Sequence, residues 1–169
     1  MRLYSGKIGA IASESVKALL AAGRIETEAP KEVEQDVAAV LTSYVRSEQE
    51  ASDLARDWQQ RRSLPPSELP RLKKAAAEQK GIKTGEDTLD FLLDQVVEML
   101  LHSSNVDEVF GEDHELRRVM APIFKKHMEA DKELEREVRG HMKHVKEGTA
   151  TWDIEYQRMR EDIKRRKGL

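Results

Sequence analysis

The sequence predicts an all-α protein, an elongated helical bundle built from two tandem copies of a three-helix unit. Charged residues make up 36% of the 169 residues and aromatic residues only 5%, a composition typical of long helices with narrow apolar stripes. The apolar residues recur at the three-and-four spacing of a helix face. The apolar pattern of the first half also recurs in the second half, which indicates an internal repeat.

The repeat is visible as three blocks that keep their order along the chain. A shift of 81 positions places Ile8 on Leu89, and a shift of 83 places Val33 on Leu116. A shift of 87 places the tripeptide 80–82 (Lys-Gly-Ile) on 167–169 (Lys-Gly-Leu). We interpret the growing shift as a duplication followed by small insertions. The predicted repeats cover residues 1–82 and 83–169 and pack as one body around a pseudo-twofold axis.

Each repeat is predicted to hold a helix, a long helix and a short basic helix. In the first repeat these cover 6–22, 30–62 and 68–80, and the long helix begins at Pro30 because proline suits the first turn. In the second repeat they cover 87–102, 113–146 and 151–167. Pro122 predicts a kink or restart inside the second long helix. The segments 25–27 and 106–108 are predicted to pair as a small β-bridge.

Composition restricts the classes of function. The chain has no cysteine, which excludes disulfides and thiolate metal sites. The net charge of −3 argues against a general nucleic-acid-coating protein but permits local basic patches. The most apolar window, residues 89–101, is too short to span a bilayer and contains three acidic residues. Because the first residues lack the apolar run of a signal peptide, we expect a cytoplasmic protein.

Several segments resemble a known bacterial family. These are the opening residues 1–7 (Met-Arg-Leu-Tyr-Ser-Gly-Lys), residues 100–103 and 105–110, the pair Glu112-Asp113, and the ending from Trp152 to Leu169. Together they are similar to the uncharacterised family called domain of unknown function 507, over essentially the whole chain. The resemblance implies a helical bacterial protein. It implies no activity, cofactor or catalytic residue.

One acidic cluster, residues 112–115 (Glu-Asp-His-Glu), looks enzyme-like because carboxylates and imidazoles can bind a metal or transfer protons. The candidate metal ligands are His102, Asp113 and His114, which would suit a metal-dependent hydrolase. However, the cluster lies where a long helix begins, and acidic residues there cap backbone N–H groups and match the helix dipole. We therefore favour capping, predict no cofactor, and lean toward a protein that is not an enzyme.

The third helices are basic in both repeats, so they could contact phosphates or an acidic partner. The alternative is a solvated helix end whose cations complement the dipole. No aromatic residue alternates with these cations in the way expected of a single-strand binder. The basic residues are Arg71, Lys73, Lys74, Arg158, Arg160, Lys164, Arg165, Arg166 and Lys167.

The last helix carries an apolar stripe at spacings of four, three and four, formed by Trp152, Tyr156, Met159 and Ile163. Such a stripe either packs on the body of the protein itself or serves as a docking surface or dimer seam. The leading functional hypothesis is a non-enzymatic interaction or assembly module that binds a protein partner, or a second copy, through this helix. The alternative is a nucleic-acid-associated protein that uses the paired basic helices.

Overall fold

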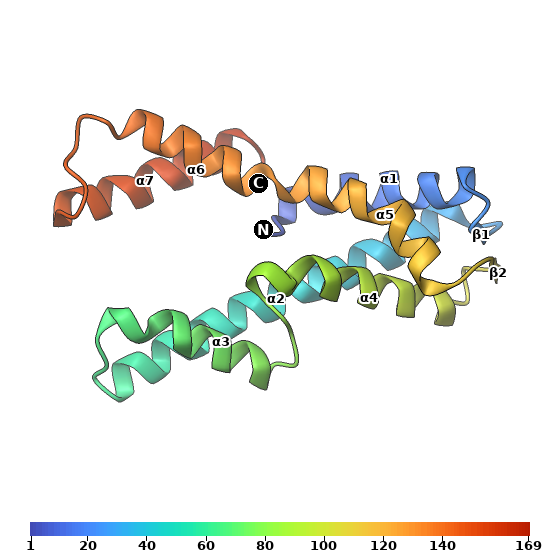
Figure 1. Cartoon of the computed structure of the whole chain (residues 1–169), viewed down its shortest axis with the longest axis horizontal. Coiled ribbons are helices and arrows are strands. Elements are labelled where there is room, and N and C mark those ends of the chain that lie inside the picture. Colours follow the sequence, from blue (N-terminus) through green and yellow to red (C-terminus); the bar gives the residue numbers. More distant parts are fainter.

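The computed structural model describes residues 1–169 and confirms the all-α class (Figure 1). Two-residue strands at the far end of the molecule are the only β-structure. No helix has the length and apolar character needed to cross a membrane. The α-helices are α1 (Ile8–Ala21), α2 (Pro30–Arg61), α3 (Leu69–Gln79), α4 (Thr88–His102), α5 (Asp113–Met128), α6 (Ala130–His141) and α7 (Ala150–Arg166).

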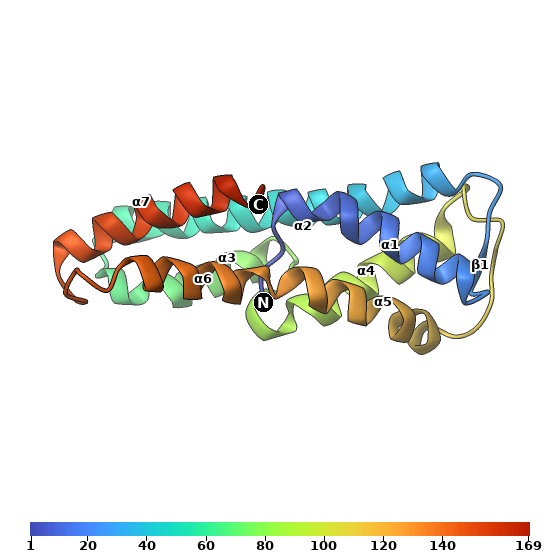
Figure 2. The same ribbon diagram turned by 90° about the horizontal axis from the view of Figure 1, so that it is seen from above.

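The molecule has the shape of a fork with one stem and two arms (Figures 1 and 2). The stem consists of α1, α4, α5 and the first half of α2, with α1 and α4 each packed on both α2 and α5. Arm 1 is formed by the second half of α2 and by α3, and arm 2 by α6 and α7. Both chain ends lie where arm 2 leaves the stem.

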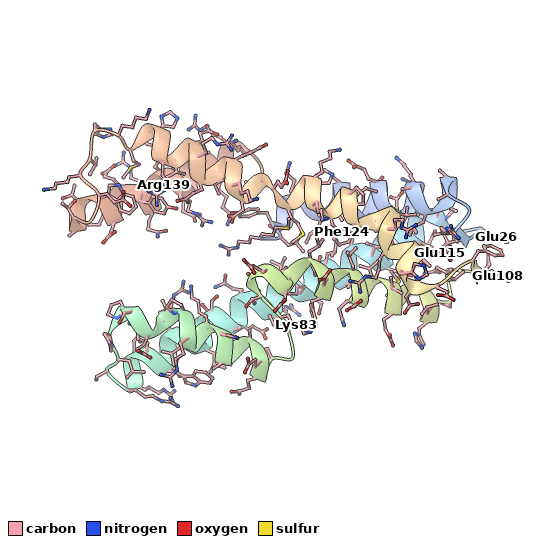
Figure 3. All side chains as sticks on the ribbon, viewed as in Figure 1. Glu26, Lys83, Glu108, Glu115, Phe124 and Arg139 are labelled. Carbon is pink, nitrogen blue, oxygen red and sulfur yellow. The ribbon has the colours of Figure 1, made fainter.

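The stem is held together by apolar faces with helical spacing. In α1 the buried positions include Ile8, Ile11, Ala12 and Leu19, which repeat every three or four residues and so line one face. Phe124 of α5, labelled in Figure 3, is completely buried among them. The apolar faces of the stem helices therefore meet in one continuous core.

Arm 1 shares this core. The buried face of α2 changes from branched and aromatic residues in the stem to Ala51 and Ala55 in the arm, and these meet Ala76 and Ala77 of α3. Small side chains let two helix backbones approach closely. Since one uninterrupted helix links the two regions, arm 1 is a continuation of the stem.

Arm 2 has a separate core of only five buried residues: Tyr4, Leu134, Val138, Met142 and Ile163. Tyr4 is the one member from outside α6, α7 and the turn that follows α6. It brings the N-terminal segment into the arm. Arm 2 thus depends on contacts far apart in the sequence.

The second long helix is interrupted, and its restart lies after Pro122 and not at it. Pro122 lies inside α5, which continues to Met128. The break falls at Glu129, whose carbonyl accepts a bond from the amide of Lys132 at 3.0 Å in a tightened turn. At this point the stem core ends and the arm core begins, so tertiary packing sets the position of the break. The helix also ends earlier than predicted, at His141 rather than near residue 146.

The two strands join the halves at the tip of the stem. The strands β1 (Ile25–Glu26) and β2 (Glu108–Val109) are antiparallel, with Ile25 opposite Val109. The predicted β-bridge is therefore formed, with its second strand shifted toward the C-terminus. The two halves show the same succession of α-helices and strands except for the α5–α6 break. Their origin by duplication, and the division at residue 82, stay predictions.

Candidate functional site

The apolar stripe of α7 packs within arm 2. Ile163 is completely buried, and Trp152, Tyr156 and Met159 are partly buried against the same small core. The rings of Trp152 and Tyr156 are stacked with centroids 4.9 Å apart. Ile163 is therefore core and is not available to a partner. The apolar stripe, which the sequence offered as a possible docking surface, packs against α6, and three of its four residues remain partly exposed.

Polar groups of α6 fix the partly buried part of this stripe. The Tyr156 hydroxyl donates to Glu135, and the guanidinium of Arg139 lies 5.7 Å from the centre of the Trp152 ring. Figure 3 shows Arg139 on the side of α6 that meets α7. The large apolar side chain that α7 does expose is Ile154, at 68%, which helical geometry places on the opposite face.

The predicted basic residues do not form one continuous cationic track, because four of the nine pair with carboxylates. Arg160 pairs with Asp131 at 3.6 Å and Lys167 with Glu137 at 2.7 Å. Arg71 and Arg158 each pair with a glutamate three residues earlier on their own helix segment. Lys74, Arg165 and Arg166 are exposed without a salt bridge, whereas Lys73 and Lys164 point to the region between the arms described below.

The acidic cluster before α5 is a helix cap. Glu112 accepts a bond from the backbone of Glu115, and the Glu115 carboxylate accepts the Glu112 amide at 2.8 Å, a complete capping box. These contacts, with Arg24 nearby, lower the pKa of Glu115. The N-cap residue is Glu112. Figure 3 shows Glu115 near the strand tip.

The candidate metal ligands are engaged separately. His102 Nδ1 lies 2.8 Å from the carbonyl oxygen of Glu98, one turn earlier in α4. His114 lies 3.4 Å from Glu112. Asp113 is the first residue of α5. No three such side chains in the structure converge in the way that a metal ion needs.

The structure assembles a different group of polar residues where the arms diverge. The N-terminal segment Met1–Ser5 lies in this fork and contacts both arms. The Tyr4 hydroxyl donates to Asp131 of α6 and accepts from Arg160 of α7 at 3.1 Å. Burial, reinforced by the Asp131 carboxylate, raises the pKa of Tyr4. Tyr4 therefore joins α6 and α7 at the base of arm 2, and its hydroxyl has hydrogen-bond partners on both helices.

On the side of arm 1 the fork contains an open cavity of about 300 Å³, which we call the fork pocket. It lies between the N-terminal segment, α2 and α3. Its charged side chains are Arg2, Glu48, Arg56 and Lys73. The remaining lining residues are Met1, Gln49, Ala51, Ser52 and Thr84. A smaller cavity of about 90 Å³, which shares Arg2 and Glu48 with the fork pocket, extends to Lys164 of α7.

The charges in the fork pocket are unbalanced. Glu48 is the only carboxylate in its wall, and burial raises the pKa of Glu48 although Arg2 and Lys73 oppose the shift. Burial lowers the pKa of Lys73, and the positive charges of Arg56 and Arg2 lower it further. Arg2, Glu48 and Lys73 make no salt bridge within 4.0 Å, while Arg56 pairs with Asp53 at the surface at 3.3 Å. The pocket thus holds two cations, Arg2 and Lys73, that lack close counter-charges, beside Arg56, which is paired at the surface.

Sequence reasoning found one member of this group, Lys73, and missed Arg2, Glu48 and Arg56. Residues 2, 48, 56 and 73 lie on three separate segments, and each is unremarkable in a chain with this many charges. Only the path of the N-terminal segment through the fork brings them together. The prominence of residues 1–7 in the family resemblance was the available signal.

Comparison with known families gives a clear assignment. A family model described as "Protein of unknown function (DUF507)" matches residues 1–169, the whole chain. The chain belongs to this family. No curated protein matches the sequence. Membership carries no activity, so the function has to be argued from the geometry.

Another cavity of this DUF507 chain offers little chemistry. It measures about 460 Å³ and lies between α2, α4 and the turn after α3. Its titratable residues are Tyr44 and Lys80. The Tyr44 hydroxyl donates to the backbone carbonyl of Lys83 at 2.9 Å, and Lys80 pairs with Glu50 at 3.0 Å. No nucleophile stands beside a free base there.

Proposed function

We propose that this protein is a non-enzymatic interaction module that receives an acidic segment of a partner protein between its two arms. The observation that carries the proposal is the fork itself: two helical arms diverge from one stem, and Arg2 and Lys73, which form no salt bridge, line a cavity beside arm 1 at this point. An open cavity with a positive lining is suited to a chain segment of opposite charge.

Arm 2 also takes part in the proposed binding, but through a basic residue and not through an exposed apolar stripe. Ile163 holds α7 to α6, and α7 then supplies Lys164 to the fork. The C-terminal helix contributes one wall of the binding region. We place this module in the bacterial cytoplasm, which is supported by the cysteine-free composition.

The nucleic-acid alternative has weaker support. A phosphate track needs several cations free to neutralise successive phosphates, and four of the nine candidates are already paired with carboxylates. The exposed residues Lys74, Arg165 and Arg166 support it. Treatment with nuclease distinguishes the two functions.

The test uses the lack of cysteine, which allows a photo-crosslinker to be attached at one chosen position. Ser52→Cys places it in the fork, and Ser104→Cys places it on the exposed stem tip as a matched control. We expect a discrete protein to be crosslinked from Ser52→Cys in native cytoplasm, to resist nuclease and to be absent with Ser104→Cys. Crosslinks that disappear with nuclease, or that are equal from both sites, would reject the proposal.

A further inference from the structure

We infer that the fork pocket is a binding site for one oxyanion, a phosphate or a carboxylate group, held by Arg2, Arg56 and Lys73. The inference specifies the chemistry of the proposed function at one cavity, but it does not need a partner protein, since a free oxyanion can enter the pocket.

First, the fork pocket carries a net positive charge. Three cations and one carboxylate line the cavity, which leaves 3 − 1 = +2 when all four groups are ionised. A guanidinium presents several N–H donors in a planar fork that matches oxyanions, and an ammonium adds a compact positive charge. The donors come from the N-terminal segment, α2 and α3, so they surround the space instead of lying along one face.

Second, two of the three cations, Arg2 and Lys73, have no counter-charge from the protein, whereas Arg56 pairs with Asp53 at the surface. No carboxylate lies within 4.0 Å of the charged atoms of Arg2 or Lys73, although the chain pairs cations with carboxylates in many other places. Glu48 lines the same cavity without forming a salt bridge to either cation, and burial disfavours its charged form. A positive field with low-dielectric walls attracts an anion more strongly than the same charges in open solvent.

Third, the two arms differ. In the predicted repeat register, Glu48 corresponds to Asp131 (a shift of 83) and Lys73 to Arg160 (a shift of 87). In arm 2 the carboxylate and the cation pair at 3.6 Å, and the Tyr4 hydroxyl bridges them. In arm 1 the corresponding groups stay apart around a cavity of about 300 Å³. In arm 2 the Tyr4 hydroxyl fills the place between the two charged groups. The cavity at the corresponding place in arm 1 is large enough for an oxyanion.

Calorimetric titration of the full chain with inorganic phosphate, and separately with an acetylated tetraglutamate peptide, tests the site. We expect saturable binding of at least one probe that weakens as salt rises. Lys73→Gln should weaken it about tenfold, the typical effect of losing one charge-assisted hydrogen bond. Lys74→Gln, the same change at an exposed neighbour on α3, should leave the affinity unchanged.

Glu48→Gln keeps the test decisive if Lys73→Gln folds poorly. Removing the only carboxylate from the wall should tighten binding by roughly threefold to tenfold, an effect that misfolding cannot imitate. Tighter binding of phosphate identifies a site for a free ion, and tighter binding of the peptide identifies a site for the acidic side chains of a partner.

Failure to bind either probe, or equal effects of Lys73→Gln and Lys74→Gln, would overturn the oxyanion site. Crosslinking from Ser52→Cys would then still decide the proposed function on its own.

Discussion

Replacing Tyr4 by alanine should unfold arm 2 and leave the stem folded. Tyr4 is 3% exposed and is one of only five buried residues in the core of that arm. Truncating a buried aromatic side chain costs about 3–5 kcal/mol, which is a large share of what so small a core supplies. The stem and arm 1 share a separate core of 27 buried residues, which does not include this ring.

Native-state hydrogen exchange measures the effect helix by helix. A loss of about 3–5 kcal/mol should accelerate exchange in α6 and α7 by roughly 100- to 4,000-fold, while amides of α1 and α4 keep their protection. Tyr4→Phe is the graded control. This variant keeps the ring and removes the hydroxyl that bonds to Asp131 and Arg160. We expect it to lower the stability of arm 2 by about 1–2 kcal/mol, because Asp131 remains partly solvated.

Two results would refute this reasoning. If Tyr4→Ala accelerated exchange equally in the stem and in arm 2, the two would be one cooperative unit, and the division between their cores would have no energetic meaning. If the protection of α6 and α7 did not change, the N-terminal segment would not support the arm.

Three further predictions concern stability. Gly6→Ala should destabilise the fold by about 1–3 kcal/mol in urea melts, because its Cβ would overlap a backbone carbonyl of the C-terminal turn. Gly9→Ala, which meets nothing, should stabilise α1 by about 1 kcal/mol; equal effects would exclude the overlap. Burial raises the pKa of all three tyrosines, that of Tyr44 to about 12, so this contribution to stability is complete below pH 10 and is lost as the pH rises through the folded values. Tyrosinate absorbance should therefore appear at lower pH in urea than in the folded protein, and identical curves would contradict it. A hydrogen bond from His127 lowers the pKa of Glu14, so its contribution is present above pH 4.5 and is lost as the pH falls; Glu14→Gln should flatten the decline of Tm in acid, and an unchanged slope would count against the contact.

Most of the secondary structure could be predicted from the sequence, because it depends on neighbours within one or two turns. The predicted start of the long helix at Pro30 is correct, and its predicted end at residue 62 lies one residue beyond the observed end. Apolar spacing, proline and helix-terminal residues are local signals. The same locality explains the correct interpretation of residues 112–115 as a cap.

The candidate site could not be predicted in this way. Arg2, Glu48 and Lys73 lie on separate segments, and charges of this kind are ordinary on solvated helix faces. A charged residue becomes part of a site only when the backbone brings a second one near it. No local pattern in the sequence specifies the path of Met1–Ser5 through the fork, or the cavity it leaves beside arm 1.

By itself, then, the sequence determined the all-α class, the order of the helices and the presence of an apolar stripe on the last one. The tertiary structure decided what covers that stripe, where the long helix breaks, and which cations meet. The difference is physical. Helix formation is set by hydrogen bonds and side-chain spacing within a few residues. The burial of Ile163 against α6 and Tyr4, and the break at Glu129, are set instead by packing between segments that are distant in the chain.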